Sequence, residues 1–468
     1  MSGLPTIRAA ASYTPSLRIN ADAFEQAWGS FDAPGIKSKA VPDADEDALT
    51  MAAEAGRHAL TAASIEGEMI DWLGWATTTP PIKEEALTPR LKSMLAIDHQ
   101  IPSLSVTDST RAGTRLLLEA PADRTALVVV SDCPDGAPDD QLGHAAGAGA
   151  TAFVLAPNGN APITDASSYE SPKPGVRFRQ PDEKHNHGLD IGQYERRAFI
   201  DAIAGAGESI TTADADAVAV QAPNGKRPYR VADSLGVDPA TIKRVETVHE
   251  LGDTGAASVP LGLTRALSDD CKTIIGASFG GGVGADVLRI EHTGAVPVTE
   301  AGSTAQQLSY AAYLRRREAI TTPAIDTGAA HVSVPTWQRS IPQRHRLVAG
   351  VCPNCDALVF PPDGACLRCH ELVSYEPVDC WTTGTIETVT TINRGGAPPE
   401  FATQQAQQGA FDVAIVALSI DGRSVSLPAQ LTTTAGVGER VKPVIRHIYT
   451  QEGVPRYGVK FAPTNAER

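Results

Sequence analysis

Four cysteines lie close together in the segment GVCPNCDALVFPPDGACLRCHELVS. They form two pairs, Cys352-x2-Cys355 and Cys366-x2-Cys369, with ten residues between the pairs. Two such pairs can place four thiolates tetrahedrally around one ion, and Zn²⁺ is the ion expected in a reducing compartment, with iron as the rival. Because four sulfurs leave no open coordination position, we expect a structural site that stabilises a small, loop-rich segment.

A second stretch that could do chemistry is DSTRAGTRLLLEA, residues 108–120. Small residues follow a strand-like run and lead into an apolar helical pattern, which is typical of a turn that carries a nucleophile. Thr110 is the residue of this turn best placed to attack a substrate. A threonine hydroxyl ionises far above neutral pH and needs a base beside it. Cys133 and His249 are alternatives, although a lone thiol or imidazole is more often structural.

Alternating strands and helices must position these residues, which favours a layered α/β fold. The residue 157–190 region is polar, rich in proline and irregular, and we interpret it as a loop or insertion. A glycine-rich turn, SFGGGVGAD, spans 278–286. The expected strands are 6–13, 125–131, 151–155, 217–220, 272–277 and 287–291, and the expected helices are 43–63, 142–150, 191–206, 229–235, 256–267 and 306–319.

Composition and charge exclude several classes of protein. The chain has 468 residues, enough for two to four domains, and a formal net charge of -15. Such a surface repels nucleic acid phosphates and anionic membranes. No run of about 18 apolar residues predicts a membrane span, and no signal peptide is evident. The clustered cysteines indicate metal binding in a reducing cytoplasm, so we expect a cytoplasmic protein without disulfides.

The segment after residue 335 changes in style. Beyond the cysteine pairs come five short β patterns, at 384–392, 411–420, 424–430, 439–448 and 457–461, which suggest a small barrel of the OB type. The cysteine pairs, the Val359-Phe360-Pro361-Pro362 stretch, Gly384-Thr385-Ile386 and the later Gly438 and Val441 closely resemble the DUF35 family, a rubredoxin-like zinc ribbon joined to an OB-fold. The resemblance implies association with thiolase-type, acyl-CoA-handling proteins.

The first 325 residues resemble the thiolase superfamily, specifically archaeal-type 3-hydroxy-3-methylglutaryl-CoA synthase. Five stretches carry the resemblance: PDADEDALTM (42–51), the 128–155 strand, Asp-bearing loop and AGAGA segment, APNGK (222–226), LGDTGAA (251–257) and SFGGGVGAD. It implies a layered αβαβα fold. We therefore expect thiolase-like halves at 1–210 and 211–330, a zinc ribbon at 335–380 and an OB-fold at 381–468.

The same resemblance implies where the chemistry of a condensing enzyme would lie. Such an enzyme needs a cysteine thiolate, a histidine and a glutamate. The cysteine position falls on Thr110, the histidine position on Gln221 and the glutamate position near Thr78. An asparagine of the family falls on Asp253. Each of these four positions therefore departs from the catalytic set.

Coenzyme A is the ligand that the resemblance implies, with Asn224, Gly225 and Lys226 as candidate contacts. We favour a non-catalytic thiolase-fold subunit that binds or scaffolds a catalytic thiolase or synthase, as a homo- or hetero-oligomer. The alternatives are an acyltransferase with an unusual catalytic set and a nucleic-acid-binding module in the ribbon and barrel. Charge and the absence of interleaved aromatics disfavour the last.

Overall fold

The computed structural model describes residues 3–181, 183–189, 191–302, 305–321, 333–393, 397–451 and 453–464. These residues form two compact units. The first unit consists of Met1–Lys92 and Ile97–Leu314, so it spans the boundary predicted at residue 210 and ends before the one predicted at residue 330. The second unit consists of Ser93–Ala96 and Arg315–Arg468, and it holds the cysteine pairs and the predicted barrel.

A ten-stranded sheet organises the first unit, with strand order β5-β4-β6-β7-β1-β8-β11-β10-β9 and β12 paired to β1. The central pairs β6–β7 and β1–β7 are antiparallel, whereas β4 runs parallel to β5 and β6. The strands are β1 (Thr6–Thr14), β4 (Trp72–Ala76), β5 (Ser103–Val106), β6 (Ala126–Asp132), β7 (Gly149–Leu155), β8 (Ala161–Lys173), β9 (Ala217–Val220), β10 (Thr273–Gly280), β11 (Gly282–Glu291) and β12 (Val298–Gly302).

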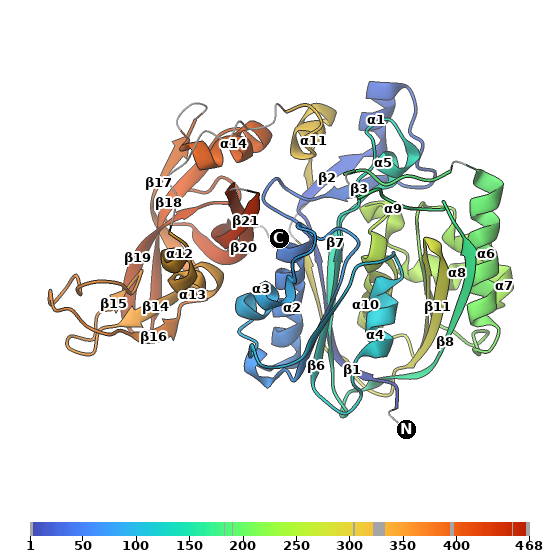
Figure 1. Ribbon diagram of the computed structural model, residues 1–468, viewed down its shortest axis with the longest axis horizontal. Helices are drawn as coiled ribbons and strands as arrows, with labels where there is room; N and C mark the ends of the chain where they lie inside the picture. Colours follow the sequence, from blue (N-terminus) through green and yellow to red (C-terminus); the bar gives the residue numbers. More distant parts are fainter. Residues whose placement is uncertain are drawn as a thin grey trace. The chain divides into compact units, whose positions relative to one another are not determined.

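Helices lie on both outer sides of this sheet, and α4 and α10 lie between its two halves (Figure 1). Helix α2 (Ala48–Ala63) packs on β1, β6 and β7, and α10 (Ser258–Ser268) lies between that half of the sheet and β9 and β10. Helix α4 (Ala112–Glu119) shares the central layer with α10, while α6 (Gly192–Gly207) packs on β8, β10 and β11. The central layer therefore brings the end of the 108–120 turn to the middle of the unit.

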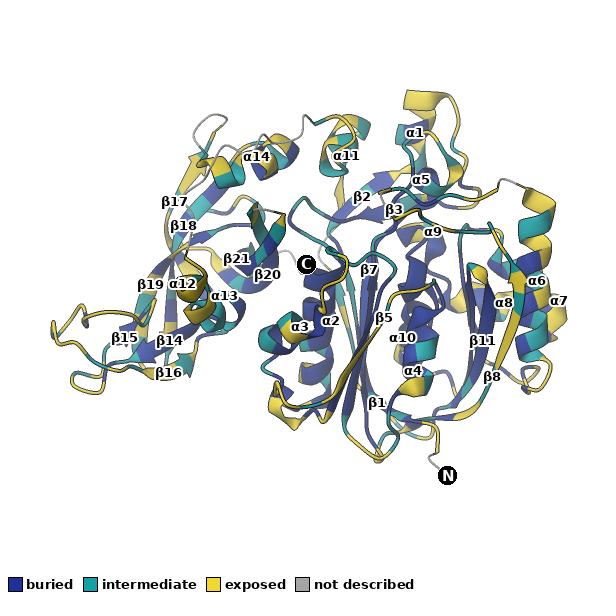
Figure 2. Cartoon of the chain, viewed as in Figure 1, coloured by how far each residue is buried: buried dark blue, intermediate teal, exposed yellow. Residues whose placement is uncertain are grey.

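Burial follows this layering (Figure 2). All residues of β6 and β7 are buried, and so is most of α10, because these elements have protein on both faces. Small residues such as alanine and glycine let the layers approach closely. A Cβ at Gly113 of α4 would lie 2.7 Å from the Ala256 carbonyl oxygen, so this position requires glycine.

The remaining elements of the unit are short. A three-stranded sheet has the order β13-β2-β3. Its strands are β2 (Leu17–Asn20), β3 (Ser38–Val41) and β13 (Gln306–Gln307). The other helices are α1 (Ala21–Trp28), α3 (Thr88–Met94), α5 (Gln141–Ala145), α7 (Ala232–Leu235), α8 (Pro239–Val245), α9 (Val248–Leu251) and α11 (Tyr310–Arg316).

The structure corrects several sequence-based predictions. The helix predicted at 43–63 begins at Ala48, because Asp47 caps it and accepts hydrogen bonds from the Leu49 and Thr50 amides. The predicted 142–150 helix ends at Ala145, and 149–155 is β7. The predicted 306–319 helix is confined to α11, and most of the glycine-rich turn extends β10 and β11.

The interpretation of 157–190 as irregular is wrong for Ala161–Lys173, which forms β8. This strand pairs with β11 along most of its length and with β1 at its start, so it joins the two halves of the sheet. Its sequence is polar because many of its side chains are exposed, and the backbone ladder holds it in place. The predicted insertion is therefore limited to the segment after Lys173.

The second unit contains a ribbon and a barrel. The ribbon sheet has the order β15-β14-β16, formed by β14 (Val348–Val351), β15 (Leu358–Val359) and β16 (Glu376–Asp379). The barrel sheet has the order β19-β18-β17-β20-β21, with α12 (Val334–Arg339), α13 (Ile341–Arg346) and α14 (Ala402–Gln408) as its helices. Its strands are β17 (Gly384–Ile392), β18 (Phe411–Ile420), β19 (Arg423–Gln430), β20 (Arg440–Gln451) and β21 (Val454–Pro463).

The five predicted barrel strands are thus confirmed, with β20 and β21 longer than expected. The barrel is nearly closed, because the Thr432 amide, just after β19, donates to the Phe461 carbonyl of β21 at 2.9 Å. Its apolar interior, with residues such as Ile386, Val416 and Phe461, is continuous with the ribbon through Ala349 and Leu358.

Candidate functional site

A cavity of about 490 Å³ in the first unit reaches Thr110, and we call it the main cavity. Its walls come from α6, from the 139–145 region and from the loop after β9, and Phe199 and Phe279 supply apolar surface. A second space of about 320 Å³, the side cavity, is lined by Thr78, Ser109 and Asn186, among others, and also reaches Thr110. The predicted nucleophile turn therefore lies at the floor of two cavities.

Thr110 is buried, with 5% of its surface exposed. Its hydroxyl donates a hydrogen bond of 2.6 Å to the Phe279 carbonyl oxygen at the end of β10. A carbonyl oxygen is a hydrogen-bond acceptor and does not take up the proton at neutral pH. This contact positions the hydroxyl without activating it as a nucleophile.

Asp253 is paired with an arginine that the sequence reasoning did not single out. Its buried carboxylate forms an ion pair and hydrogen bond with Arg177 Nη1. Burial alone would lower the pKa of Arg177, but the charges of Asp253 and Asp132 outweigh it and raise the pKa above its ordinary value. A permanent cation from the segment after β8 thus neutralises Asp253 inside the site.

Gln221 lies where the resemblance places a histidine, at the end of β9, and it is 2% exposed. Its Nε2 donates to the Gly255 carbonyl at 2.8 Å, and its Oε1 has no hydrogen-bond partner among the described residues. An amide neither releases nor takes up a proton near neutral pH. Gln221 can therefore orient a ligand but cannot act as an acid or a base.

Thr78 is one of three consecutive threonines that surround the buried carboxylate of Asp132. The Thr78 hydroxyl donates to Asp132 Oδ2 at 2.7 Å, the Thr79 hydroxyl donates to Oδ1, and the Ala256 amide adds a bond of 2.8 Å to Oδ2. These donors satisfy the carboxylate. The Thr-rich stretch therefore anchors the loop after β4 to the end of β6.

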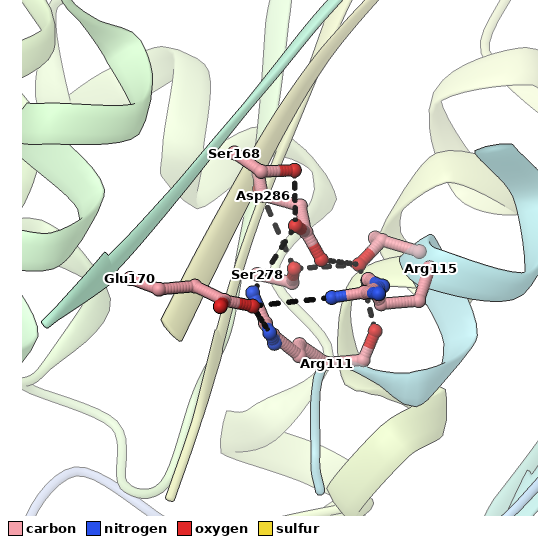
Figure 3. Close-up of polar contacts among 7 residues, drawn as sticks. Arg111, Arg115, Ser168, Glu170, Ser278 and Asp286 are labelled. Atoms are coloured by element: carbon pink, nitrogen blue, oxygen red, sulfur yellow. Dashed lines mark hydrogen bonds and ion pairs between the residues drawn. The ribbon is translucent and has the colours of Figure 1, made fainter. Parts of the chain in front are cut away.

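Arg111, next to Thr110, is a further residue that the sequence reasoning missed. Figure 3 shows its guanidinium between Asp286 of β11 and Glu170 of β8, with Arg115 also directed at Glu170. The hydrogen bond and charge of Arg111 lower the pKa of Glu170. Ser168 donates to Asp286 Oδ1 at 2.7 Å, so the buried carboxylate is well satisfied (Figure 3).

Two glycines of the predicted glycine-rich turn make room for this network. A Cβ at Gly284 would lie 2.4 Å from Arg111 Cζ, and one at Gly280 would lie 2.5 Å from Ser109 Oγ. The glycine pattern was therefore the sequence signal that could have revealed this network. At Gly284 it reflects the space that the Arg111 side chain needs. The network fixes the start of α4, and with it Thr110, against the β10–β11 hairpin.

The two alternative nucleophiles or bases lie outside both cavity linings. The Cys133 thiol is half-buried, 3.6 Å from the Thr79 hydroxyl. His249 accepts or donates at both ring nitrogens, with the Tyr229 hydroxyl at 2.8 Å from Nε2 and the Gly35 carbonyl at 2.6 Å from Nδ1. Neither residue is brought to Thr110.

His187, from the region interpreted as an insertion, does line the main cavity. Its backbone pairs with Phe178, by hydrogen bonds of 3.0 and 2.8 Å, and its Nε2 lies 2.6 Å from Glu183 Oε2. The sequence offered no signal for this placement, since the segment reads as polar loop. His187 is therefore an imidazole on the cavity wall, with the Glu183 carboxylate beside it.

The three residues proposed to contact coenzyme A lie at the cavity rim or beyond it. Asn224 lines the main cavity, and its Oδ1 accepts from the Lys226 and Arg227 amides at 3.0 Å each. Gly225 is buried against Gly35, where an added Cβ would lie 2.6 Å from backbone. Lys226 is exposed, and it is Arg227 that lines the cavity.

The second unit holds the metal site that the spacing predicts. The sulfur atoms of Cys352, Cys355, Cys366 and Cys369 all lie within 4.8 Å of one another, and two of the pairs are 3.6 and 3.7 Å apart. Four sulfurs at about 2.3 Å from one tetrahedral Zn²⁺ would be roughly 3.8 Å apart, so the geometry fits a structural ion. The turns are built locally, since the Asp356 amide donates to the Cys352 carbonyl and the His370 amide to the Cys366 carbonyl.

Comparison with known proteins finds relatives for parts of both units. Residues 339–373 match the family described as "ChsH2, rubredoxin-like zinc ribbon domain". The fold resembles a crystal structure of HMG-CoA synthase complexed with CoA, with a TM-score of 0.61, 17% identity and coverage of 70% of this chain and 94% of that one. It also resembles 3-oxoacyl-(acyl carrier protein) synthase III from Pseudomonas aeruginosa, with a TM-score of 0.54, 20% identity and coverage of 63% and 100%.

The first unit is thus a thiolase-like α/β fold with a cavity at the start of its central helix. In sequence, the chain is 30% identical over 335 residues to the hydroxymethylglutaryl-CoA synthase of Methanocaldococcus jannaschii, covering 66% of this chain and 94% of the relative. It is 28% identical over 334 residues to that of Archaeoglobus fulgidus, covering 66% and 97%. The chain belongs to the hydroxymethylglutaryl-CoA synthase family.

The comparisons and the structure bear on two further expectations. The cysteine cluster and the zinc ribbon match support a structural metal. In the described part of the chain, no helix is long and apolar enough to span a membrane.

Proposed function

We propose that this chain is a non-catalytic thiolase-fold subunit that binds or scaffolds a condensing enzyme acting on acyl-CoA. One observation carries the proposal. The Thr110 hydroxyl, which the resemblance places at the family's nucleophile position, donates to the Phe279 carbonyl, and the Asp253 carboxylate is paired with Arg177. A condensation needs a thiolate or an activated hydroxyl to take the acyl group, and this arrangement provides neither.

The charges around Thr110 support the same proposal. Arg177 neutralises Asp253, and three threonine side chains with a backbone amide satisfy Asp132. Gln221, at which the resemblance places a proton-moving histidine, is buried. A site of this kind can hold a thioester through apolar walls and a few donors, while it lacks the acid–base pair that enolate formation requires.

The second unit supplies the reason to expect a partner. The zinc ribbon and the nearly closed barrel add a module with its own core to the thiolase-like unit. Two structures of the curacin pathway HMG synthase, at 15–16% identity, contain a donor acyl carrier protein, so that related protein works with a partner. We infer that this chain pairs with a catalytic thiolase or synthase, in the cytoplasm, with CoA or acyl-CoA as the ligand of its main cavity.

A reconstitution experiment tests this proposal. The purified chain is incubated with acetyl-CoA and acetoacetyl-CoA, alone and with the thiolase or synthase that co-purifies from native extract. We expect no new carbon–carbon bond from the chain alone, and a higher turnover of the partner when the chain is added. Formation of hydroxymethylglutaryl-CoA by the chain alone, at a rate well above that of the Thr110→Ala variant, would refute the subunit role.

A second candidate function is favoured by the imidazole on the cavity wall. His187 and Thr110 both line the main cavity, so an acyltransferase that uses this pair is the alternative. Its test is the pair of variants Thr110→Ala and His187→Ala, with Cys133→Ser as the control outside the cavity. Equal loss of acyl transfer in the first two variants, and none in the control, would support the alternative over the subunit role.

A further inference from the structure

Three residues line both the main cavity and the side cavity, and we call them the dividing wall. Only Thr110, Arg177 and Gly281 of the described residues line both spaces. Arg177 is the largest of the three and the one with the longest side chain. Arg177 therefore lies at the boundary between the two cavities.

The backbone of this wall is fixed from several sides. The Phe178 and His187 backbones exchange two hydrogen bonds, and the Arg179 guanidinium donates to the Thr78 carbonyl at 2.8 Å. On the other side, a Cβ at Gly281 would lie 2.3 Å from the Arg177 carbonyl oxygen, so the glycine-rich hairpin fits tightly against it. These contacts leave the Arg177 side chain as the part of the wall that can be changed without moving the backbone.

The side chain is held by charge. Arg177 Nη1 pairs with the Asp253 carboxylate, which is 2% exposed. An arginine that swings out of this position would leave a buried carboxylate without its partner, which is strongly unfavourable. The ion pair therefore holds the Arg177 side chain in its observed position.

The two spaces differ in chemistry. The main cavity has apolar surface near Thr110 from Phe199 and Phe279. The side cavity is polar and basic, since Lys83 and Arg179 line it, against one carboxylate, Asp108, in the same lining. An acyl group that extended past Arg177 would need a polar or anionic end to be stable there.

We propose that Arg177 determines which acyl groups the site accepts: it confines a bound thioester to a short acyl chain, and the basic side cavity behind it suits a longer chain that ends in a carboxylate. This inference rests on the proposed binding of acyl-CoA in the main cavity. It assigns a selective role to a residue that neither the motifs nor the catalytic positions of the family single out.

Two double variants separate the effect of the size of the Arg177 side chain from the effect of its charge. Arg177→Ala with Asp253→Asn removes both charges and opens the wall, whereas Arg177→Met with Asp253→Asn removes both charges and keeps the bulk. Thermal melts of the two proteins establish that both fold. Titration calorimetry then compares acetyl-CoA, hexanoyl-CoA and glutaryl-CoA on each variant and on the unaltered chain.

The opened variant should bind glutaryl-CoA about tenfold or more tightly than the Met variant, because one well-filled extension of a pocket is worth an affinity change of this size. Acetyl-CoA should bind the two variants equally, and hexanoyl-CoA should gain less than glutaryl-CoA. Equal glutaryl-CoA affinities, or parallel changes for all three thioesters, would overturn the role of Arg177. Acetyl-CoA that binds none of the three proteins would instead overturn the proposed acyl-CoA ligand, and the role of Arg177 with it.

Discussion

The ribbon and the main cavity treat their reactive groups in opposite ways. In the ribbon, four thiols converge within 4.8 Å with no cation from the protein among the residues that form the cluster. In the unit that holds the main cavity, the buried carboxylates Asp253 and Asp286 are already balanced, the first by Arg177 and the second by Arg111 and hydroxyls. The ribbon is arranged to take up an ion, whereas the cavity floor is arranged to hold its shape.

This difference shows that a recognisable motif can indicate either a reactive site or only a fold. The cysteine pairs retain the groups that their chemistry needs, so spacing alone predicted the site. The thiolase-like turn retains its position at the start of α4, while the neighbouring polar groups are directed at one another. Retained geometry is therefore evidence of fold, and only unpaired reactive groups in that geometry are evidence of catalysis.

The largest expected effect comes from removing one cysteine of the four-sulfur cluster in the ribbon. Cys366→Ser removes one of four ligands, and metal binding is most of the folding free energy of such small sites, about 10–16 kcal/mol in zinc-finger peptides. We expect loss of bound metal and rapid proteolysis of the 345–380 region. Elemental analysis and limited proteolysis measure both, with Cys133→Ser, outside the ribbon, as the control. Retention of one equivalent of metal by the Cys366 variant would contradict a four-sulfur site.

Disrupting the Arg177–Asp253 ion pair should lower the free energy of unfolding by less than the loss of the metal. Arg177→Ala leaves the buried Asp253 carboxylate unpaired, and loss of one partner of a buried pair costs about 3–5 kcal/mol. Adding Asp253→Asn should recover most of that loss, because the uncompensated charge disappears. Denaturant melts of the two single variants, the double variant and the unaltered chain give the coupling energy. Additive effects of the two substitutions would show that the pair does not stabilise the site.

Glu246 provides a third case in this comparison, a buried carboxyl group whose protonated form is favoured by burial. Burial raises its pKa to about 7, even though it accepts hydrogen bonds from the Thr247 and Val248 amides. A raised pKa in the folded state means stability that is present below the unfolded pKa of about 4.5 and lost as the pH rises through about 7, for a total of about 3 kcal/mol.

Glu246→Gln should therefore be more stable than the unaltered chain at pH 8 and should lose this part of the pH dependence between pH 5 and 7. Denaturant melts at pH 5, 6, 7 and 8 measure the difference between the two proteins. A difference that stays constant across this range would mean that Glu246 titrates normally.

Much of the fold could be predicted from the sequence, for reasons that particular elements make clear. The segment 126–132 is a continuous apolar run of buried-strand type, and α10 is a run of small and apolar residues typical of a buried helix. Strand β8 could not be predicted, because its outward side chains are polar and its pairing partner, β11, lies more than 100 residues away. The 142–150 helix failed for a similar reason, since the extended pairing of β7 with β1 and β6 overrides the helix propensity of its alanines.

The site could be predicted only in part. Resemblance placed Thr110 and Gln221 at the main cavity, and glycine spacing marked the β10–β11 hairpin. Arg177 and His187 could not be found, because they reach the cavity from a segment with no periodicity. Arg111 was visible in the turn, yet its ion pairs depend on β8 and β11 and on the space left by Gly284.

The smallest expected effect concerns Lys226 at the rim. Its side chain is exposed, so a contact with a CoA phosphate would be worth at most about 1 kcal/mol, or roughly fivefold in affinity at low salt. Lys226→Ala should weaken CoA binding by this factor at low ionic strength and by less at high ionic strength. Titration at two salt concentrations measures it, and an unchanged affinity at low salt would remove Lys226 from the proposed contacts.

The most direct test of the account is whether the chain ever becomes acylated. The intact protein is mixed with excess acetyl-CoA, quenched in acid at times from milliseconds to minutes, and weighed by mass spectrometry, with a family synthase as the positive control. The account predicts an unmodified mass at every time, because the Thr110 hydroxyl donates to a carbonyl and, among the described residues, forms no hydrogen bond with a base. A mass increase of one acetyl group that maps to Thr110 and disappears in Thr110→Ala would contradict it.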